Sequence, residues 1–240
     1  MTLAHPLPVE RVSVRAPVDA GPDEWPRSLA PVRHMCEHGM LLGQATVLVG
    51  ENGVGKSTIV EAIALAYGLS PEGGSTGAFH RTRPSESPLH EDLVLSRGAG
   101  ASRWGYFIRA ESMHGLFTYL EQHPGAIPER FHELSHGQSF LELVDRKLEG
   151  TGLFVLDEPE AGLSFQSQLT VVAALLELLE RPGAQLLVAT HSPVIAALPG
   201  AQILQLDDDG IAEVAWDDLE TVAHHRSFVD DPERYLRFLT

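Results

Sequence analysis

The sequence predicts an α/β fold in which helices cover both faces of a mostly parallel central sheet. Three short apolar runs, at residues 45–49, 152–156 and 185–189, have the composition of strands buried on both faces. Apolar residues recur with helical spacing in segments 56–67 and 165–179, which alternate with those strands as the helices of a parallel sheet do. We therefore expect residues 1–240 to form a single domain around this sheet.

The remaining segments predict additions to the central sheet. Residues 1–44 mix proline with short apolar stretches, which favours a small N-terminal β region and irregular structure. Residues 70–103 are rich in Gly, Ser and Pro, which predicts a flexible loop. We expect a helix over residues 113–121 and another after Gln138, and a β-hairpin near the C-terminus, where an acidic turn separates two short apolar runs.

Charge and composition limit the classes of function. The formal net charge of −16 should repel a phosphate backbone over most of the surface, since non-specific nucleic-acid binding depends on Lys and Arg. The apolar runs are far shorter than the ~20 residues that span a bilayer, and no export signal is evident at the N-terminus. The single cysteine, Cys36, suits a reducing compartment. We expect a cytoplasmic protein with no direct membrane insertion.

A local excess of arginine leaves a nucleic-acid contact open. Segment 70–103 carries several arginines within an acidic chain, and they suit either a solvated loop or a docking surface for a nucleic acid or an acidic partner. The arginines concerned are Arg81, Arg83, Arg97 and Arg103.

The segment GENGVGKS at residues 50–57 matches the phosphate-loop pattern G-x-x-x-x-G-K-[ST] at every specified position. The glycines allow a sharp turn whose backbone N–H groups approach an anion, and the following helix adds the positive end of its dipole. Lys56 should reach the β- and γ-phosphates, and the Ser57 hydroxyl should bind Mg²⁺. The residues expected to bind the nucleotide here are Gly50, Asn52, Gly53, Val54, Gly55, Lys56, Ser57 and Thr58.

Two further strand ends carry polar side chains. Asp157 and Glu158 follow the apolar run 152–156, at the carboxyl edge where parallel sheets bind ligands. We expect Asp157 to hold Mg²⁺ through water and Glu158 to orient or deprotonate the attacking water. His191 follows the next strand and can contact the γ-phosphate and that water.

Together these segments resemble the ABC ATPase family. GENGVGKST is similar to its phosphate loop, LFVLDEPEAGLS to its acidic strand and D-loop, ATHSP to its switch histidine, and LSHGQS at residues 134–139 to its signature. These motifs span residues 46–193. Within the family, FIRAES and DDPERYLRFL are similar to segments of small stand-alone bacterial ATPases, which are distantly related to the heads of chromosome-maintenance and DNA-repair ATPases.

The resemblance implies ATP and Mg²⁺ as cofactors and an ATP-dependent homodimer. In the family two domains pair head to tail around two ATP molecules. Ser135, Gly137 and Gln138 of one chain would then cap the γ-phosphate held by Lys56 of the other. Lys56, Glu158 and His191 would be the catalytic residues.

The sequence departs from the family pattern at three places. A glutamine normally ends the strand after the phosphate loop and touches Mg²⁺, whereas residues 109–112 read Arg-Ala-Glu-Ser, so Glu111 or Ser112 would have to supply a metal ligand. His136 replaces a signature glycine, and Ser164 replaces the D-loop aspartate. Two alternatives to an ATPase with an unidentified partner therefore stay open. The chain could be the ATP-binding subunit of a membrane transporter, or a nucleotide-dependent binding module that hydrolyses little ATP.

Overall fold

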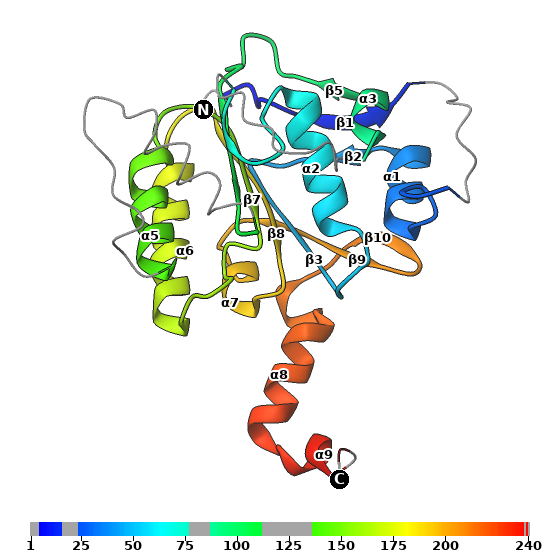
Figure 1. The fold of residues 1–240 in the computed structure, drawn as a ribbon, viewed down its shortest axis with the longest axis vertical. Helices are drawn as coiled ribbons and strands as arrows, with labels where there is room; N and C mark the ends of the chain where they lie inside the picture. The colour runs from blue at the N-terminus through cyan, green and yellow to red at the C-terminus, as the bar shows by residue number, and fades with distance from the viewer. Residues whose placement is uncertain (1–4, 16–23, 77–86, 112–135, 238, 240) are drawn as a thin grey trace.

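A seven-stranded sheet forms the centre of the protein (Figure 1). The computed structural model describes residues 5–15, 24–76, 87–111, 136–237 and 239. Five central strands run parallel in the order β9-β3-β8-β7-β6, and β10 and β4 pair antiparallel at the two edges. The predicted mostly parallel α/β sheet is thus confirmed. Its strands are β3 (Ala45–Gly50), β4 (Gly74–Ser75), β6 (Gly105–Arg109), β7 (Gly152–Asp157), β8 (Ala184–Thr190), β9 (Gln202–Asp207) and β10 (Gly210–Glu213).

Helices cover both faces of this sheet, because the central strands are apolar on both sides (Figure 1). One core contains side chains of α5 (His136–Lys147), α6 (Phe165–Leu179) and α7 (Pro193–Ala196). The other contains side chains of α1 (Ala30–His38) and α2 (Lys56–Tyr67). Alternate residues of one strand enter opposite cores, as Val47 and Leu48 do in β3.

A second, three-stranded antiparallel sheet has the order β2-β1-β5 and corresponds to the predicted small N-terminal β region. Its third strand corrects the expectation of a loop over residues 70–103. Within that segment, α3 (Leu89–Asp92) leads into β5 (Leu93–Ser96), and β5 pairs along the whole of β1. The partner strand lies about eighty residues away in sequence, so local composition could not reveal the pairing. The other two strands are β1 (Arg11–Val14) and β2 (Met40–Leu41).

One buried side chain joins the two sheets. Gln185, at the start of β8, is 1% exposed. Its Oε1 accepts from the Val9 backbone N–H at 2.8 Å, and its Nε2 donates to the carbonyls of Val9 at 2.6 Å and Gly43 at 2.8 Å. The side-chain amide thus binds the backbone of Val9, which precedes β1 of the small sheet, and that of Gly43, which precedes β3 of the central sheet.

The C-terminal segment leaves the body of the molecule. After the β9–β10 hairpin, which was predicted, η2 (Trp216–Asp218) and α8 (Glu220–Asp230) lead to α9 (Glu233–Leu236), and α8 projects away from the sheet (Figure 1). The helix expected over residues 113–121 lies outside the described residues. Within the described part of the chain, no helix is both long and apolar enough to cross a membrane.

Candidate functional site

The loop between β3 and α2 has a shape that only its glycines permit. Gly53 and Gly55 have φ values of 81° and 110°, in the left-handed region. A Cβ on Gly50 would lie 2.3 Å from the Leu206 carbonyl oxygen, so β9 leaves no room for a side chain there. The predicted helix over residues 56–67 is confirmed and ends at Gly68, which adopts a left-handed cap conformation.

Lys56 opens α2 and turns its side chain back into the loop. Its Nζ donates to the carbonyls of Gly50 and Glu51, both at 2.9 Å, and the residue is 4% exposed. Burial lowers the pKa of Lys56, and the carboxylates of Glu158, Asp157 and Glu160 oppose this effect. The loop therefore holds a buried cation at its centre, a fitting arrangement for an anionic ligand.

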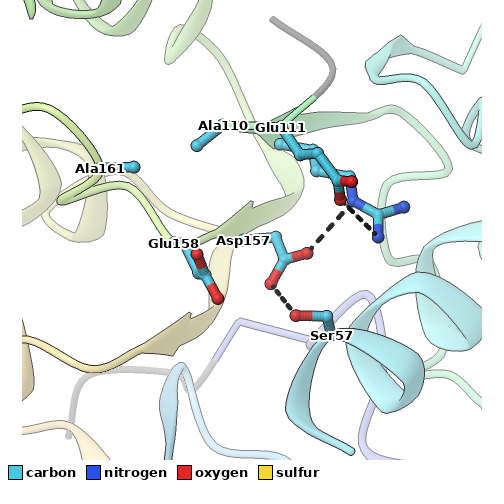
Figure 2. A pocket seen from close by; sticks show the side chains of 7 residues that line it. Ser57, Ala110, Glu111, Asp157, Glu158 and Ala161 are labelled. Atoms are coloured by element: carbon cyan, nitrogen blue, oxygen red, sulfur yellow. Dashed lines mark hydrogen bonds and ion pairs between the residues drawn. The ribbon is translucent and has the colours of Figure 1, made fainter. Parts of the chain in front are cut away.

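The acidic strand end lies against the loop. Strands β3 and β7 both pair with β8, so their carboxyl ends meet at one edge of the sheet. There the Ser57 hydroxyl donates to Asp157 Oδ1 at 2.9 Å, as Figure 2 shows. Asp157 is 4% exposed, and burial raises its pKa to about 6, although Arg109 and the hydrogen bond from Ser57 act in the opposite direction. The two motifs that the sequence separates by a hundred residues are in contact.

Glu158 and His191 lie beside this contact. Glu158 has a positive φ of 52°, and its carboxylate Oε1 is 3.6 Å from His191 Nε2. The His191 backbone N–H donates to Glu160 Oε1 at 2.6 Å, which fixes the end of β8 to the turn after β7. Burial and the nearby Lys56 lower the pKa of His191.

The donor atoms at this edge fit Mg²⁺. Ser57, Asp157 and Glu158 line a pocket of about 280 Å³, and its other lining residues are Arg109, Ala110, Glu111 and Ala161. Hydroxyl and carboxylate oxygens are the hard ligands that Mg²⁺ prefers, and Mg²⁺ takes few protein ligands when phosphate oxygens and water supply the rest. No group of three His, Cys, Asp or Glu residues able to hold a metal occurs in the described ranges.

The structure brings most of the expected site residues together, and it adds three for which no role was predicted. Glu111 reaches the pocket, but its carboxylate is 85% exposed and lies 3.5 Å from the Arg109 guanidinium. Ser112 and Ser135 lie outside the described residues, and Gly137 and Gln138 belong to the first turn of α5. The added residues are Glu61, Arg109 and Glu160.

A wider groove of about 940 Å³ continues from the phosphate loop on the side away from the acidic strand. Its walls are the beginning of α1, the β9–β10 turn with Asp207, and the first turns of α8. His191 faces both this groove and Glu158. The phosphate loop therefore lies between a small pocket that contains the acidic strand end and a larger groove of the size that a nucleoside needs.

These features define a P-loop nucleotide-binding protein: a glycine loop with a buried lysine joins a central strand to a helix, and an acidic strand end contacts the loop serine. The family model described as "AAA domain, putative AbiEii toxin, Type IV TA system" matches residues 45–136 and 119–197.

Curated relatives agree with this class. The chain is 30% identical over 226 residues to an aliphatic sulfonates import ATP-binding protein of Paracoccus denitrificans, covering 87% of this chain and 88% of the relative. It is 26% identical over 188 residues to an uncharacterized ABC transporter ATP-binding protein of Haemophilus influenzae, covering 68% and 70%. The chain belongs to the ABC-type ATPase family.

Solved structures of low sequence identity also superpose on this chain. A dimeric ATP-binding cassette in a post-hydrolysis state with ADP and phosphate superposes with a TM-score of 0.46 at 16% identity, covering 75% of this chain and 90% of that one. An ABC transporter component from Clostridium perfringens gives a TM-score of 0.45 at 16% identity, covering 84% and 90%.

Proposed function

We propose that this protein binds ATP with Mg²⁺ and hydrolyses it to ADP and phosphate, acting as a head-to-tail dimer that ATP closes and hydrolysis opens. The observation that supports this most directly is the hydrogen bond from Ser57 to Asp157, which joins the phosphate loop to the acidic strand end. Membership of the ABC-type ATPase family supports nucleotide binding and hydrolysis in the same way.

Each site residue has a role that follows from its position. The loop N–H groups and Lys56 bind the β- and γ-phosphates, and nucleotide replaces the loop carbonyls as the partner of the ammonium group. Ser57 and Asp157 would hold Mg²⁺, which stabilises negative charge on the phosphates when bound. Glu158 orients the attacking water and accepts its proton, and His191, adjacent to Glu158, keeps that water in place.

Two substitutions and a control test this function. Lys56→Ala should abolish nucleotide binding, because the only cation buried inside the described part of the loop is removed. Glu158→Gln should preserve binding and reduce phosphate release by ~10²-fold or more, since it keeps shape and removes the base. Glu177→Gln, an exposed acid on α6, should match the parent protein. Hydrolysis by the Glu158→Gln variant at the parent rate would remove Glu158 from the mechanism.

The ATP-binding subunit of a membrane transporter is the second candidate. The names of the relatives favour it, since they include the sulfonate import protein above and a zinc import ATP-binding protein of Aliivibrio fischeri, 29% identical over 150 residues, covering 60% of this chain and 57% of the relative. A transporter role requires a membrane-spanning partner. Two results together would count against this role: no neighbouring open reading frame encodes such a partner, and the addition of lipid and membrane protein does not change the rate of ATP hydrolysis.

A DNA-related role has less support than the sequence suggested. Of the four arginines in segment 70–103, Arg97 donates to the Pro8 carbonyl at 3.1 Å and stacks 4.2 Å from the Tyr67 ring centroid, so it is engaged within the fold. The net charge of −16 opposes non-specific binding, and the transport-related names of the relatives point elsewhere. Phosphate release measured with and without DNA decides between this role and an ATPase independent of nucleic acid.

A further inference from the structure

The end of β6 carries a cation, Arg109, beside the acidic strand end. Arg109 and Asp157 are register partners at the ends of β6 and β7. Arg109 Nε lies 3.4 Å from Asp157 Oδ2, and its Nη1 forms an ion pair with Glu61 Oε2 of α2. The guanidinium is 20% exposed, and the two carboxylates are 4% and 12% exposed. Three different elements therefore contribute to one partly buried charge cluster.

The cluster needs this cation when nothing else is bound. Two buried carboxylates without a counter-charge would each cost several kcal/mol of desolvation and repel one another. Lys56, the other cation at this edge of the described structure, donates to the Gly50 and Glu51 carbonyls instead. Arg109 is thus the group that compensates Asp157 and Glu61 directly.

The Asp157 carboxylate faces the Arg109 guanidinium and also lines the pocket that fits a divalent metal. Its Oδ1 accepts from Ser57 and its Oδ2 faces Arg109, while the pocket between Ser57, Asp157 and Glu158 is the place whose donors fit a divalent cation (Figure 2). A cation drawn to Asp157 meets a fixed positive charge within a few ångströms. An arginine cannot relieve this repulsion by losing a proton, so it has to shift its interaction towards its other carboxylates, the buried Glu61 and the exposed Glu111.

We propose that Arg109 is a built-in counter-ion that competes with the divalent metal for Asp157, and that Glu61 sets the strength of the competition by holding the guanidinium. This inference rests on the proposed function and adds a positioning pair to it. Without metal, Arg109 keeps the Asp157 carboxylate in place. With metal, the pull of Glu61 weakens the hold of Arg109 on Asp157.

Metal binding measured directly tests the proposal. Free Mn²⁺ is quantified by its electron paramagnetic resonance signal during titration of the protein with ADP present, so hydrolysis does not enter. Arg109→Gln should tighten Mn²⁺ half-saturation by roughly threefold to tenfold, because a nearby positive charge is lost. Glu61→Gln should weaken it by a similar factor, because Arg109 then loses its ion pair with α2 and interacts more strongly with Asp157. Arg109→Lys, which keeps the charge, should stay within about threefold of the parent.

A control separates this role from simple loss of packing. Arg27, which precedes α1, forms a comparably buried ion pair with Asp92 of α3, and their side chains are 15% and 23% exposed. Arg27→Gln should lower the melting temperature and leave Mn²⁺ half-saturation unchanged.

Opposite shifts from Arg109→Gln and Glu61→Gln support the counter-ion. Shifts of both variants in the same direction, or no shift in either, overturn the proposal. It is also overturned if Arg109→Gln lowers kcat while the affinity for Mn²⁺ stays parental, because the guanidinium would then act on the phosphate and not on the metal site. If Arg109→Gln does not fold, the Glu61→Gln variant still tests the proposal, because Mn²⁺ binding that is unchanged or tighter than in the parent contradicts it. A parent protein that binds neither ADP nor Mn²⁺ refutes the proposed function itself, a result distinct from those shifts.

Discussion

At the residue scale, the backbone at Glu158 is the most unusual feature of the site. Among the described residues other than glycine, it alone has a positive φ, and its N–H donates to the Ala189 carbonyl at 2.9 Å while its own carbonyl accepts from the Ala161 N–H at 3.0 Å. These two bonds hold a conformation that costs an L-residue on the order of 1 kcal/mol. Strain at this point sets the direction in which the carboxylate leaves the strand.

The strain predicts a trade between stability and activity. Glu158→Asn should raise the free energy of unfolding of the nucleotide-free protein by up to ~1 kcal/mol, because asparagine tolerates the left-handed region, and it should abolish hydrolysis. Urea denaturation and phosphate release measure the two effects. A variant less stable than the parent would show that the turn is not strained at this residue.

Asp157 predicts a pH dependence of the metal-free protein. Its pKa is raised from 3.8 to about 6 by burial, so the folded protein holds a proton on Asp157 more tightly than the unfolded chain does. The stability that this proton contributes is fully present below pH 3.8 and is lost as the pH rises through about 6. The full difference corresponds to roughly 3 kcal/mol at about 1.4 kcal/mol per pKa unit. With a chelator present, the parent should lose stability relative to Asp157→Asn between pH 4 and 7. Parallel pH curves for the two proteins would contradict this.

The residues of the site divide into those that motifs reveal and those that only contacts reveal. Lys56, Ser57, Asp157 and Glu158 were predictable because each occupies a fixed place beside a buried strand or a glycine turn. Glu61 was not predictable, because a glutamate within a helix is expected to face solvent unless its partner is known. Arg109 could be recognised as a departure from the family, but its pairing with Glu61 and Asp157 depends on three elements meeting in space.

At the element scale, the central sheet was predictable, whereas the small sheet was predicted only as an N-terminal β region without its third strand, β5. Strands buried on both faces give continuous apolar runs, such as residues 153–156, that need no partner to be recognised. β5 has only four residues, of which Leu93 is buried, Leu95 is half-buried and the other two are exposed, and it follows a segment rich in Gly, Ser and Pro. Its identity as a strand depends on pairing with β1, so the surrounding composition predicted a loop instead.

The connection between the two sheets depends on Gln185. Substitution by Met keeps the volume but leaves the Val9 N–H and the carbonyls of Val9 and Gly43 without their side-chain partner in a buried place. We expect a loss of ~2–4 kcal/mol in the free energy of unfolding, since each buried group left unpaired costs about 1–3 kcal/mol. Chemical denaturation measures this loss. Gln44→Ala, at an exposed side chain that donates to Leu179 O, is the control and should change stability by less than about 1 kcal/mol.

At the scale of the whole molecule, one chain presents only part of the proposed site. The edge at Lys56, Asp157 and Glu158 is open at both the small pocket and the larger groove. α5, whose first turn contains Gly137 and Gln138, packs with α6 on the opposite face of the sheet from α2, the helix of the phosphate loop (Figure 1). A head-to-tail arrangement of two copies would place one chain's α5 N-terminus at the other chain's loop, where its dipole favours an anion.

Mixing two inactive variants tests that arrangement. Lys56→Ala removes the loop cation, and Ser135→Arg blocks the segment proposed to cap the γ-phosphate, so each homodimer lacks both sites. In a mixed dimer, the intact loop of the Ser135→Arg chain faces the intact cap of the Lys56→Ala chain, which rebuilds one site. Half of randomly assorted dimers are mixed, so hydrolysis should return to at most roughly a quarter of the parent rate in a two-fold symmetric assembly. If each chain completed its own site, the mixture would stay as inactive as its components, and the phosphate-release assay would show no recovery at any mixing ratio.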